Sequence, residues 1–243
     1  MTYCVGLKID RGLVFMSDTR TNAGMDSISI FRKMHVWEKP GERTIVLMSA
    51  GNLATTQAVI SLLDERCKAP KDRSPSLLAT PSMYQTARLV GDTVKEVIVS
   101  SSLSGEKADS YFNASFILGG QIRGSEPRLF MIYPEGNFIE SSEDTPFFQV
   151  GETKYGKPII IRAYDKAMSF AETVKLLIVS FDSTLKSNLS VGLPLDLLLY
   201  EKDTFKVGLK KRIGLDDPYY RTVSDGWSSA LKLAFQSLPD FPD

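Results

Sequence analysis

Short runs of apolar residues separated by Gly- and Pro-containing turns open the chain, and this pattern predicts β-hairpins. The turns fall at residues 10–12 and 40–42, where Gly and Pro supply the backbone geometry that a tight turn requires. The predicted strands around them cover residues 3–9, 13–17, 35–39 and 43–50. We expect the second hairpin to extend the antiparallel sheet that the first hairpin begins.

The pattern then changes to the helical spacing of apolar residues. Asn52 is a candidate N-cap, and the positions that follow it on one face are Thr56, Val59, Ile60 and Leu63. A second helix is expected over residues 82–99. A new group of strands follows, at residues 113–122, 127–133 and 137–141, and predicts a second sheet.

Two helices are expected after Gly151, and the clearer one carries its apolar face at Phe170, Val174, Leu177, Phe181 and Leu185. Strands at residues 194–202 and 205–211 come next. A terminal helix follows, marked by Trp227, Leu231, Ala234 and Leu238, and ends before Pro239. Runs of strands alternating with pairs of helices predict an α+β fold, a four-layer αββα sandwich of two antiparallel sheets covered by helices.

Composition narrows the class of protein. The chain has 243 residues, of which 43% are hydrophobic and 24% charged, so we expect one soluble domain over residues 1–243. Lys plus Arg and Asp plus Glu both total 29, which gives no bulk attraction to nucleic acid. Neither a signal-peptide pattern nor a membrane-spanning apolar run is evident, which predicts a cytoplasmic protein without membrane contact.

The chain contains few of the histidine and cysteine residues that many catalytic and metal sites use. His35 is the single histidine, which excludes most Ser/His/Asp, Cys/His and multi-histidine metal sites unless His35 itself takes part. Cys4 and Cys67 lie far apart and without metal-ligand spacing, so we expect two reduced thiols and no metal. No phosphate-binding loop is present, and we expect no cofactor.

Thr2 offers another chemistry, because removal of Met1 would make it N-terminal. A free α-amine titrates near pH ~8 and can deprotonate the hydroxyl of its own residue through a water molecule. Such a nucleophile needs a cation that lowers the pKa of the amine, a carboxylate that orients the cation, and N–H donors for the oxyanion. A candidate for each role stands at a strand end. The carboxylate is Asp18 in SDTRTNAG, the cation is Lys33 in FRKMH, and the N–H donor is Gly51 in LMSAGNLATT.

These motifs together resemble the superfamily of proteasome β-subunits and HslV, the N-terminal-nucleophile hydrolases. The start TYCVGLK, the segment around Asp18, the Arg-Lys pair and the Ala-Gly turn carry the likeness. MTYCVGLKIDRGLVFMSDTRTNAGMDSISIFRKMH, SAGNLATTQAV and SFDSTLKSNLSVGLPLDLLLY are similar, more narrowly, to the Anbu group of bacterial proteasome homologues.

The resemblance implies a role for each candidate. Thr2 would be the nucleophile and, through its amine, the base; Lys33 would lower the pKa of the amine, and Asp18 would pair with Lys33. Gly51 would donate its N–H to the oxyanion. Arg20 would support the site, and residues 22–24 would contact the substrate backbone as an added strand.

The chain also departs from the family pattern. Lys33 follows Thr2 by one residue fewer than is typical. Where the family has a serine that bonds the amine, the stretch VGETKYG places Glu152, and where the family has an aspartate, KSNLSVG offers Ser187 and Ser190. A carboxylate at Glu152 that reaches the amine would raise its pKa and weaken it as a base.

The sequence therefore predicts a threonine peptidase that acts through Thr2 within a homo-oligomer, either a ring or a helical stack, on peptide or protein substrates. Two alternatives stay open. One is an amidase that cleaves a small amide or a specific conjugate with the same residues. The other is a catalytically weak assembly or scaffold protein, which retention of Met1 would favour. The sequence identifies no unfoldase or adaptor partner.

Overall fold

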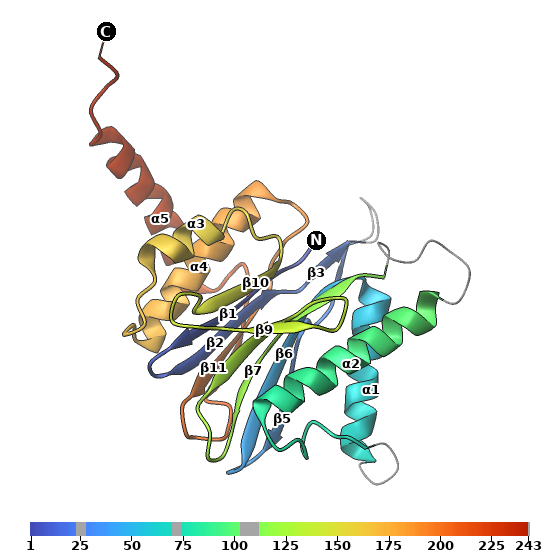
Figure 1. The fold of residues 1–243 in the computed structure, drawn as a ribbon. Coiled ribbons are helices and arrows are strands. Elements are labelled where there is room, and N and C mark those ends of the chain that lie inside the picture. The colour runs from blue at the N-terminus through green and yellow to red at the C-terminus, as the bar shows by residue number, and fades with distance from the viewer. Residues whose placement is uncertain (23–27, 70–73, 103–111, 243) are drawn as a thin grey trace.

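The computed structural model describes residues 1–22, 28–69, 74–102 and 112–242. Two antiparallel five-stranded sheets pack face to face, and helices cover the outer face of each sheet (Figure 1). This arrangement confirms the predicted αββα sandwich.

The first sheet is built around the N-terminal hairpin. Its strand order is β10-β1-β2-β11-β12, with every neighbouring pair antiparallel. The strands are β1 (Tyr3–Ile9), β2 (Gly12–Asp18), β10 (Phe147–Gly151), β11 (Leu195–Glu201) and β12 (Leu209–Ile213). A separate ribbon follows β2 and consists of β3 (Arg20–Asn22) and β4 (Ile28–Ile30).

The second sheet has the order β5-β6-β7-β8-β9. Its strands are β5 (Met34–Lys39), β6 (Arg43–Gly51), β7 (Ala114–Ile122), β8 (Arg128–Ile132) and β9 (Phe138–Glu140). The prediction that the second hairpin extends the first sheet is wrong. That hairpin pairs through β6 with all nine residues of β7, from Arg43 opposite Ile122 to Gly51 opposite Ala114, a long-range pairing that no local pattern specifies.

Helices α1 (Leu53–Lys68) and α2 (Met83–Ser102) cover the second sheet, and α3 (Lys157–Ala163) and α4 (Phe170–Ser187) cover the first. Asn52 caps α1 as predicted, since its side chain accepts a hydrogen bond from the N–H of Thr55. A capping box between Ser169 and Glu172 begins α4.

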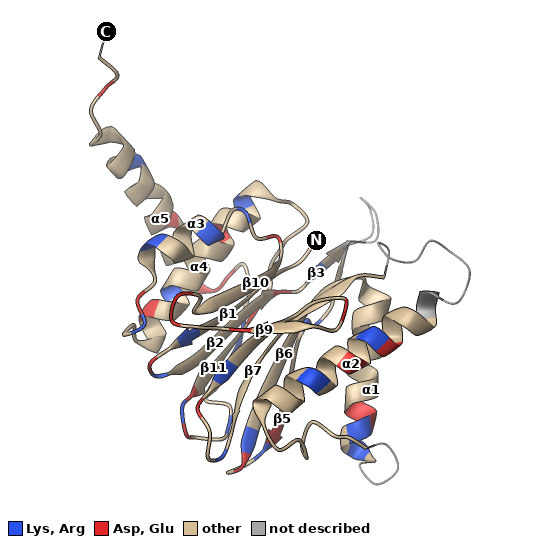
Figure 2. Cartoon of the chain, viewed as in Figure 1, with Lys and Arg blue, Asp and Glu red and all other residues tan. Residues whose placement is uncertain are grey.

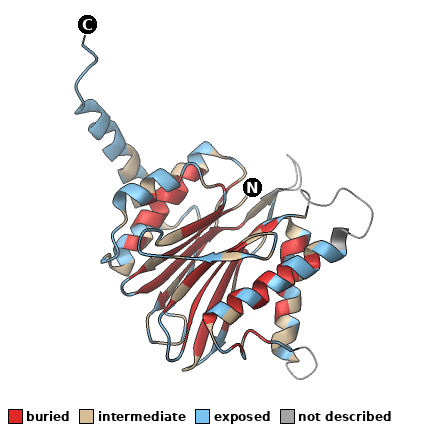
Figure 3. Cartoon of the chain, in the orientation of Figure 1, coloured by how far each residue is buried: buried red, intermediate tan, exposed pale blue. Residues whose placement is uncertain are grey.

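Three apolar clusters fill the spaces between these layers. One lies between the two sheets and includes Cys4, Phe15 and Ile117; the others lie under the two pairs of helices. Figure 3 shows the buried residues concentrated on the strands and on the inner faces of α1 to α4. Both cysteines are free thiols, as expected.

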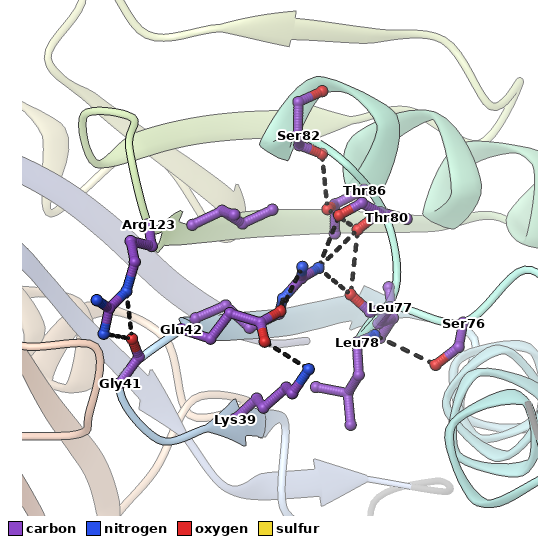
Figure 4. Close-up of polar contacts among 12 residues, drawn as sticks. Lys39, Gly41, Glu42, Ser76, Leu77, Leu78, Thr80, Ser82, Thr86 and Arg123 are labelled. Atoms are coloured by element: carbon purple, nitrogen blue, oxygen red, sulfur yellow. Dashed lines mark hydrogen bonds and ion pairs between the residues drawn. The ribbon is translucent and has the colours of Figure 1, made fainter.

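The connection between α1 and α2 is held by a buried arginine. Arg43, at the start of β6, donates to the carbonyls of Leu77 and Thr80 over 3.2 and 2.7 Å and pairs with Glu42. Figure 4 labels these three partners. The Thr80 hydroxyl lies 2.7 Å from that of Thr86 on α2. These contacts fix the start of α2 on the start of β6.

The C-terminal part differs from its prediction in two places. The strand expected over residues 205–211 lies later, at β12, because Asp203 and Phe205 have positive φ angles of 65° and 50° and form a turn. The last helix, α5 (Pro218–Gln236), begins earlier than its apolar marks indicate, since Asp217 caps it and Pro218 occupies its first turn. Short strands β3, β4 and β10 were not predicted.

Candidate active site

A buried ion pair lies at the end of β2. The Nζ atom of Lys33 is 2.7 Å from Oδ1 of Asp18, and the side chains of Lys33 and Asp18 are 7% and 0% exposed. Oδ1 also accepts the N–H of Tyr3 over 3.0 Å, and Oδ2 accepts the N–H of Gly192 over 3.4 Å. Residues from β1, β2, the β4–β5 connection and the segment before β11 therefore meet at one carboxylate.

Burial and charge act in opposite directions on Asp18. Desolvation raises the pKa of its carboxyl, while the Lys33 ammonium and the two backbone donors lower it. Because removal of one partner of a buried pair leaves the other charge unmatched, Asp18 and Lys33 depend on each other.

Lys33 is also held from the opposite side. Its Nζ donates to the carbonyl of Arg20 over 2.7 Å, and the Arg20 guanidinium donates to the carbonyl of Leu189 over 2.9 Å. Two of the three ammonium N–H groups are thus engaged, by Asp18 and by Arg20. Arg20 links the ion pair to the turn after α4.

Thr2 lies directly before β1 and faces the end of β10. Its carbonyl accepts the N–H of Glu152 over 2.6 Å. Gly151 has a φ of 88°, and a Cβ atom there would lie 1.9 Å from the Thr2 carbonyl oxygen, so only glycine allows this approach. The tight pairing fixes the backbone of Thr2.

A cavity of about 870 Å³ opens beside Thr2, and Lys33 and Gly51 line it together with Thr2. Gly51 ends β6 at a φ of 118°, immediately before the Asn52 cap of α1. Three of the four predicted catalytic residues therefore line one cavity, and the fourth, Asp18, contacts Lys33 without being among the lining residues. Thr21 and Gly151 also line the cavity, whereas residues 23 and 24 lie outside the described residues.

Glu152 is 6% exposed and directly follows Gly151, which lines the cavity. Its carboxylate accepts the N–H of Lys154 over 3.1 Å and the side-chain amide of Asn188 over 2.8 Å. Both donors are neutral. The α-amine belongs to Met1 in this structure: burial lowers its pKa first, Lys33 lowers it further, and Asp18 and Glu152 raise it.

Ser187 and Ser190 have hydrogen-bond partners other than Glu152. The Ser187 hydroxyl donates to the carbonyl of Ser183, one turn back along α4. Ser190 donates its backbone N–H to the Asn188 side chain over 2.9 Å. The residue that reaches Glu152 is thus Asn188, which the sequence-based reasoning missed. Its place directly after α4 is the signal that could have indicated it.

Other functional features of the described residues are limited. In the described part of the chain no group of three or more His, Cys, Asp or Glu side chains is arranged to bind a metal ion. The described helices include none of the length and apolarity needed to cross a membrane. Basic and acidic residues are interspersed along the helices of both layers (Figure 2).

Comparison with known proteins places this geometry in a family. The model of the proteasome subunit family matches residues 2–193. The chain belongs to the proteasome subunit family. Anbu from Hyphomicrobium sp. strain MC1 is 53% identical over all of both chains, with a TM-score of 0.91. No curated protein matches the chain in sequence.

Two further solved structures of Anbu proteins are similar to this chain. Anbu, the ancestral beta-subunit, from Yersinia bercovieri is 49% identical over 100% of this chain and 99% of its own, with a TM-score of 0.93. A structure of the helical assembly of the Anbu complex from Pseudomonas aeruginosa is 45% identical over the same shares, with a TM-score of 0.92. The chain therefore has the proteasome-type N-terminal-nucleophile hydrolase fold.

Proposed function

We propose that this Anbu-type protein is a threonine peptidase whose nucleophile is Thr2, exposed by removal of Met1, and which acts within a homo-oligomer. The observation that carries the proposal is the buried Asp18–Lys33 pair at the wall of the cavity that Thr2 lines. A buried ion pair is costly to maintain, and its place beside a cavity favours a catalytic role.

In the proposed reaction the α-amine of Thr2 accepts the proton of its own hydroxyl through a water molecule. The oxygen attacks the substrate carbonyl, and the N–H of Gly51 stabilises the oxyanion. The protonated amine then returns the proton to the leaving amine as the C–N bond breaks. A water molecule, deprotonated by the same amine, hydrolyses the ester and restores Thr2. Lys33 keeps the pKa of the amine low enough for the free base to form.

Cleavage assays test the proposal. Protein freed of Met1 should cleave members of a panel of unstructured peptides, and Thr2→Ala protein should cleave none. The panel should include small amides, because cleavage of these alone supports the amidase alternative. Absence of cleavage across both classes, together with identical behaviour of the two proteins, supports the scaffold alternative and contradicts the peptidase.

Replacement of Glu152 by glutamine tests the effect of the carboxylate on the base. A negative charge beside the amine raises its pKa, so its removal should lower that pKa. The free amine then persists to lower pH, and the acidic limb of the pH profile of kcat/KM should move to lower pH. The exposed variant Glu143→Gln, which removes the same charge elsewhere, should leave the limb in place. An unchanged limb in Glu152→Gln would show that Glu152 does not influence the base.

Self-assembly is supported by the surface of α5. Tyr220 is the buried residue of this helix, whereas Leu233 and Phe235 near its end are 67% and 78% exposed. The helix projects away from the two sheets, with most of its surface uncovered (Figures 1 and 3). Exposed apolar residues gathered on one element are typical of an interface. The relative from Pseudomonas aeruginosa forms a helical assembly, and we propose that this chain also self-assembles.

A charged double variant of this helix, Leu233→Asp/Phe235→Asp, should reduce the size of the assembly. Two carboxylates placed in an apolar contact would be desolvated without partners, which opposes association. Light scattering coupled to size-exclusion chromatography measures the effect. The control Gln236→Asp adds charge at an exposed position of the same helix and should leave the mass unchanged. Equal masses for the double variant and the unmodified protein would exclude α5 from the interface.

A further inference from the structure

The cavity beside Thr2 extends along one face of α1. Leu53, Gln57 and Ser61 line it at intervals of four residues, so they follow one side of the helix for about 12 Å. Phe31 and Arg32, from the connection between β4 and β5, line it as well. A volume of about 870 Å³ lies within the range of ligand pockets and can admit a peptide segment.

The charged side chains among the described lining residues of this cavity are of one sign. Arg32 and Lys33 line it, and no Asp or Glu is among the described lining residues. Asp18 balances Lys33, but Arg32 is exposed and forms no ion pair with any residue that the structure describes. Of the two cationic lining residues, Arg32 is therefore the one that can form an ion pair with a ligand.

The other polar groups of the cavity are neutral. Burial lowers the pKa of His35, so its ring is uncharged near neutral pH. Ser49, Thr56 and Gln57 offer side-chain hydrogen bonds without charge. Helix α1 begins at Leu53 in the cavity wall, and its N-terminal end adds partial positive charge. A side chain that enters this cavity meets the cationic side chain of Arg32, the N-terminal end of α1 and neutral hydrogen-bonding groups.

We propose that this cavity selects peptide substrates with Asp or Glu beside the cleaved bond, and that Arg32 determines this specificity. A carboxylate gains a charged hydrogen-bonding partner there, whereas Lys or Arg would be repelled by the same group. The inference rests on the proposed peptidase function of Thr2.

A matched set of peptides that differ only at the residue before the cleaved bond tests the proposal. With protein freed of Met1, kcat/KM should be about tenfold higher for Glu than for the isosteric Gln, and lowest for Lys. The difference should shrink as salt concentration rises, since Arg32 is exposed. Arg32→Gln should abolish the difference between Glu and Gln, and Arg32→Glu should favour Lys. The control Arg162→Gln, which removes an exposed arginine of α3, should retain the preference.

Binding measurements separate failure of this inference from failure of the peptidase proposal. Thr2→Ala protein should bind the Glu peptide more tightly than the Gln peptide in fluorescence anisotropy, and only when Arg32 is present. Such binding without cleavage by the unmodified protein supports the specificity and overturns the peptidase. Equal cleavage and equal binding of the Glu and Gln peptides, or a preference that persists in Arg32→Gln, overturns the role of Arg32.

Discussion

Replacement of Lys33 by methionine is expected to abolish cleavage and to lower the free energy of unfolding by about 3–5 kcal/mol. The variant keeps a long apolar side chain but leaves the fully buried Asp18 carboxylate without its cation. The carboxylate retains the N–H groups of Tyr3 and Gly192 as donors, and these do not neutralise it. In the structure Lys33 lowers the pKa of the Met1 amine, and we expect the Thr2 amine freed by removal of Met1 to lose the same effect in this variant. Urea unfolding and the peptide assay measure the two effects.

A second substitution separates stability from catalysis. Lys33→Met/Asp18→Asn removes both charges, so much of the lost stability should return while cleavage stays absent. Lys175→Met, an exposed change on α4, should alter neither quantity by much more than about 0.5 kcal/mol. Full cleavage by Lys33→Met would contradict the catalytic role of the pair, and unchanged stability would contradict its structural role.

Replacement of Gly51 by alanine is expected to lower the free energy of unfolding by about 2–5 kcal/mol and to suppress cleavage strongly. The φ of 118° is unfavourable for any residue with a Cβ atom, and that atom would lie 2.2 Å from the carbonyl oxygen of Asn113. The end of β6 must then move relative to β7. Because the N–H of Gly51 is the proposed oxyanion donor, this movement would displace it from the reacting carbonyl.

Gly124 provides a matched control, since it has a φ of 86° but a Cβ atom added there would have nothing within 4 Å. Gly124→Ala therefore has the unfavourable φ without a steric clash of the added Cβ atom. We expect its free energy of unfolding to fall by about 1 kcal/mol, with cleavage retained. Thermal unfolding of both variants at the same pH makes the comparison. Equal losses of unfolding free energy in Gly51→Ala and Gly124→Ala would show that the backbone moves at no cost to relieve the contact between the added Cβ atom and Asn113.

The sequence predicted the layers well because each layer has a strong local period. Local sequence, spanning about one element, is enough to predict the hairpin around Gly12, the cap at Asn52 and the apolar face of α4. The prediction of which sheet contains the β5–β6 hairpin was wrong, because the pairing of β6 with β7 joins residues more than sixty positions apart. Short edge strands such as β10 carry too few residues for a period to emerge.

The candidate site was only partly predictable for a related reason. Motifs of the resembled family indicated Asp18 and Lys33, and the structure places their side chains in contact. Asn188 lacks such a motif, and its contact with Glu152 depends on how the chain leaves α4. Arg32 stands next to Lys33 in sequence, yet only the cavity shows that both face the same space.

The central claim is that Thr2 is an N-terminal nucleophile, and the mass of the intact protein after reaction with a threonine-directed electrophile tests it most directly. The protein should be expressed natively, and the adduct should be mapped by fragmentation. We predict a chain that lacks Met1 and carries one adduct on Thr2, and no adduct in Lys33→Met. Retention of Met1 in all molecules, with no adduct on Thr2, would contradict the claim.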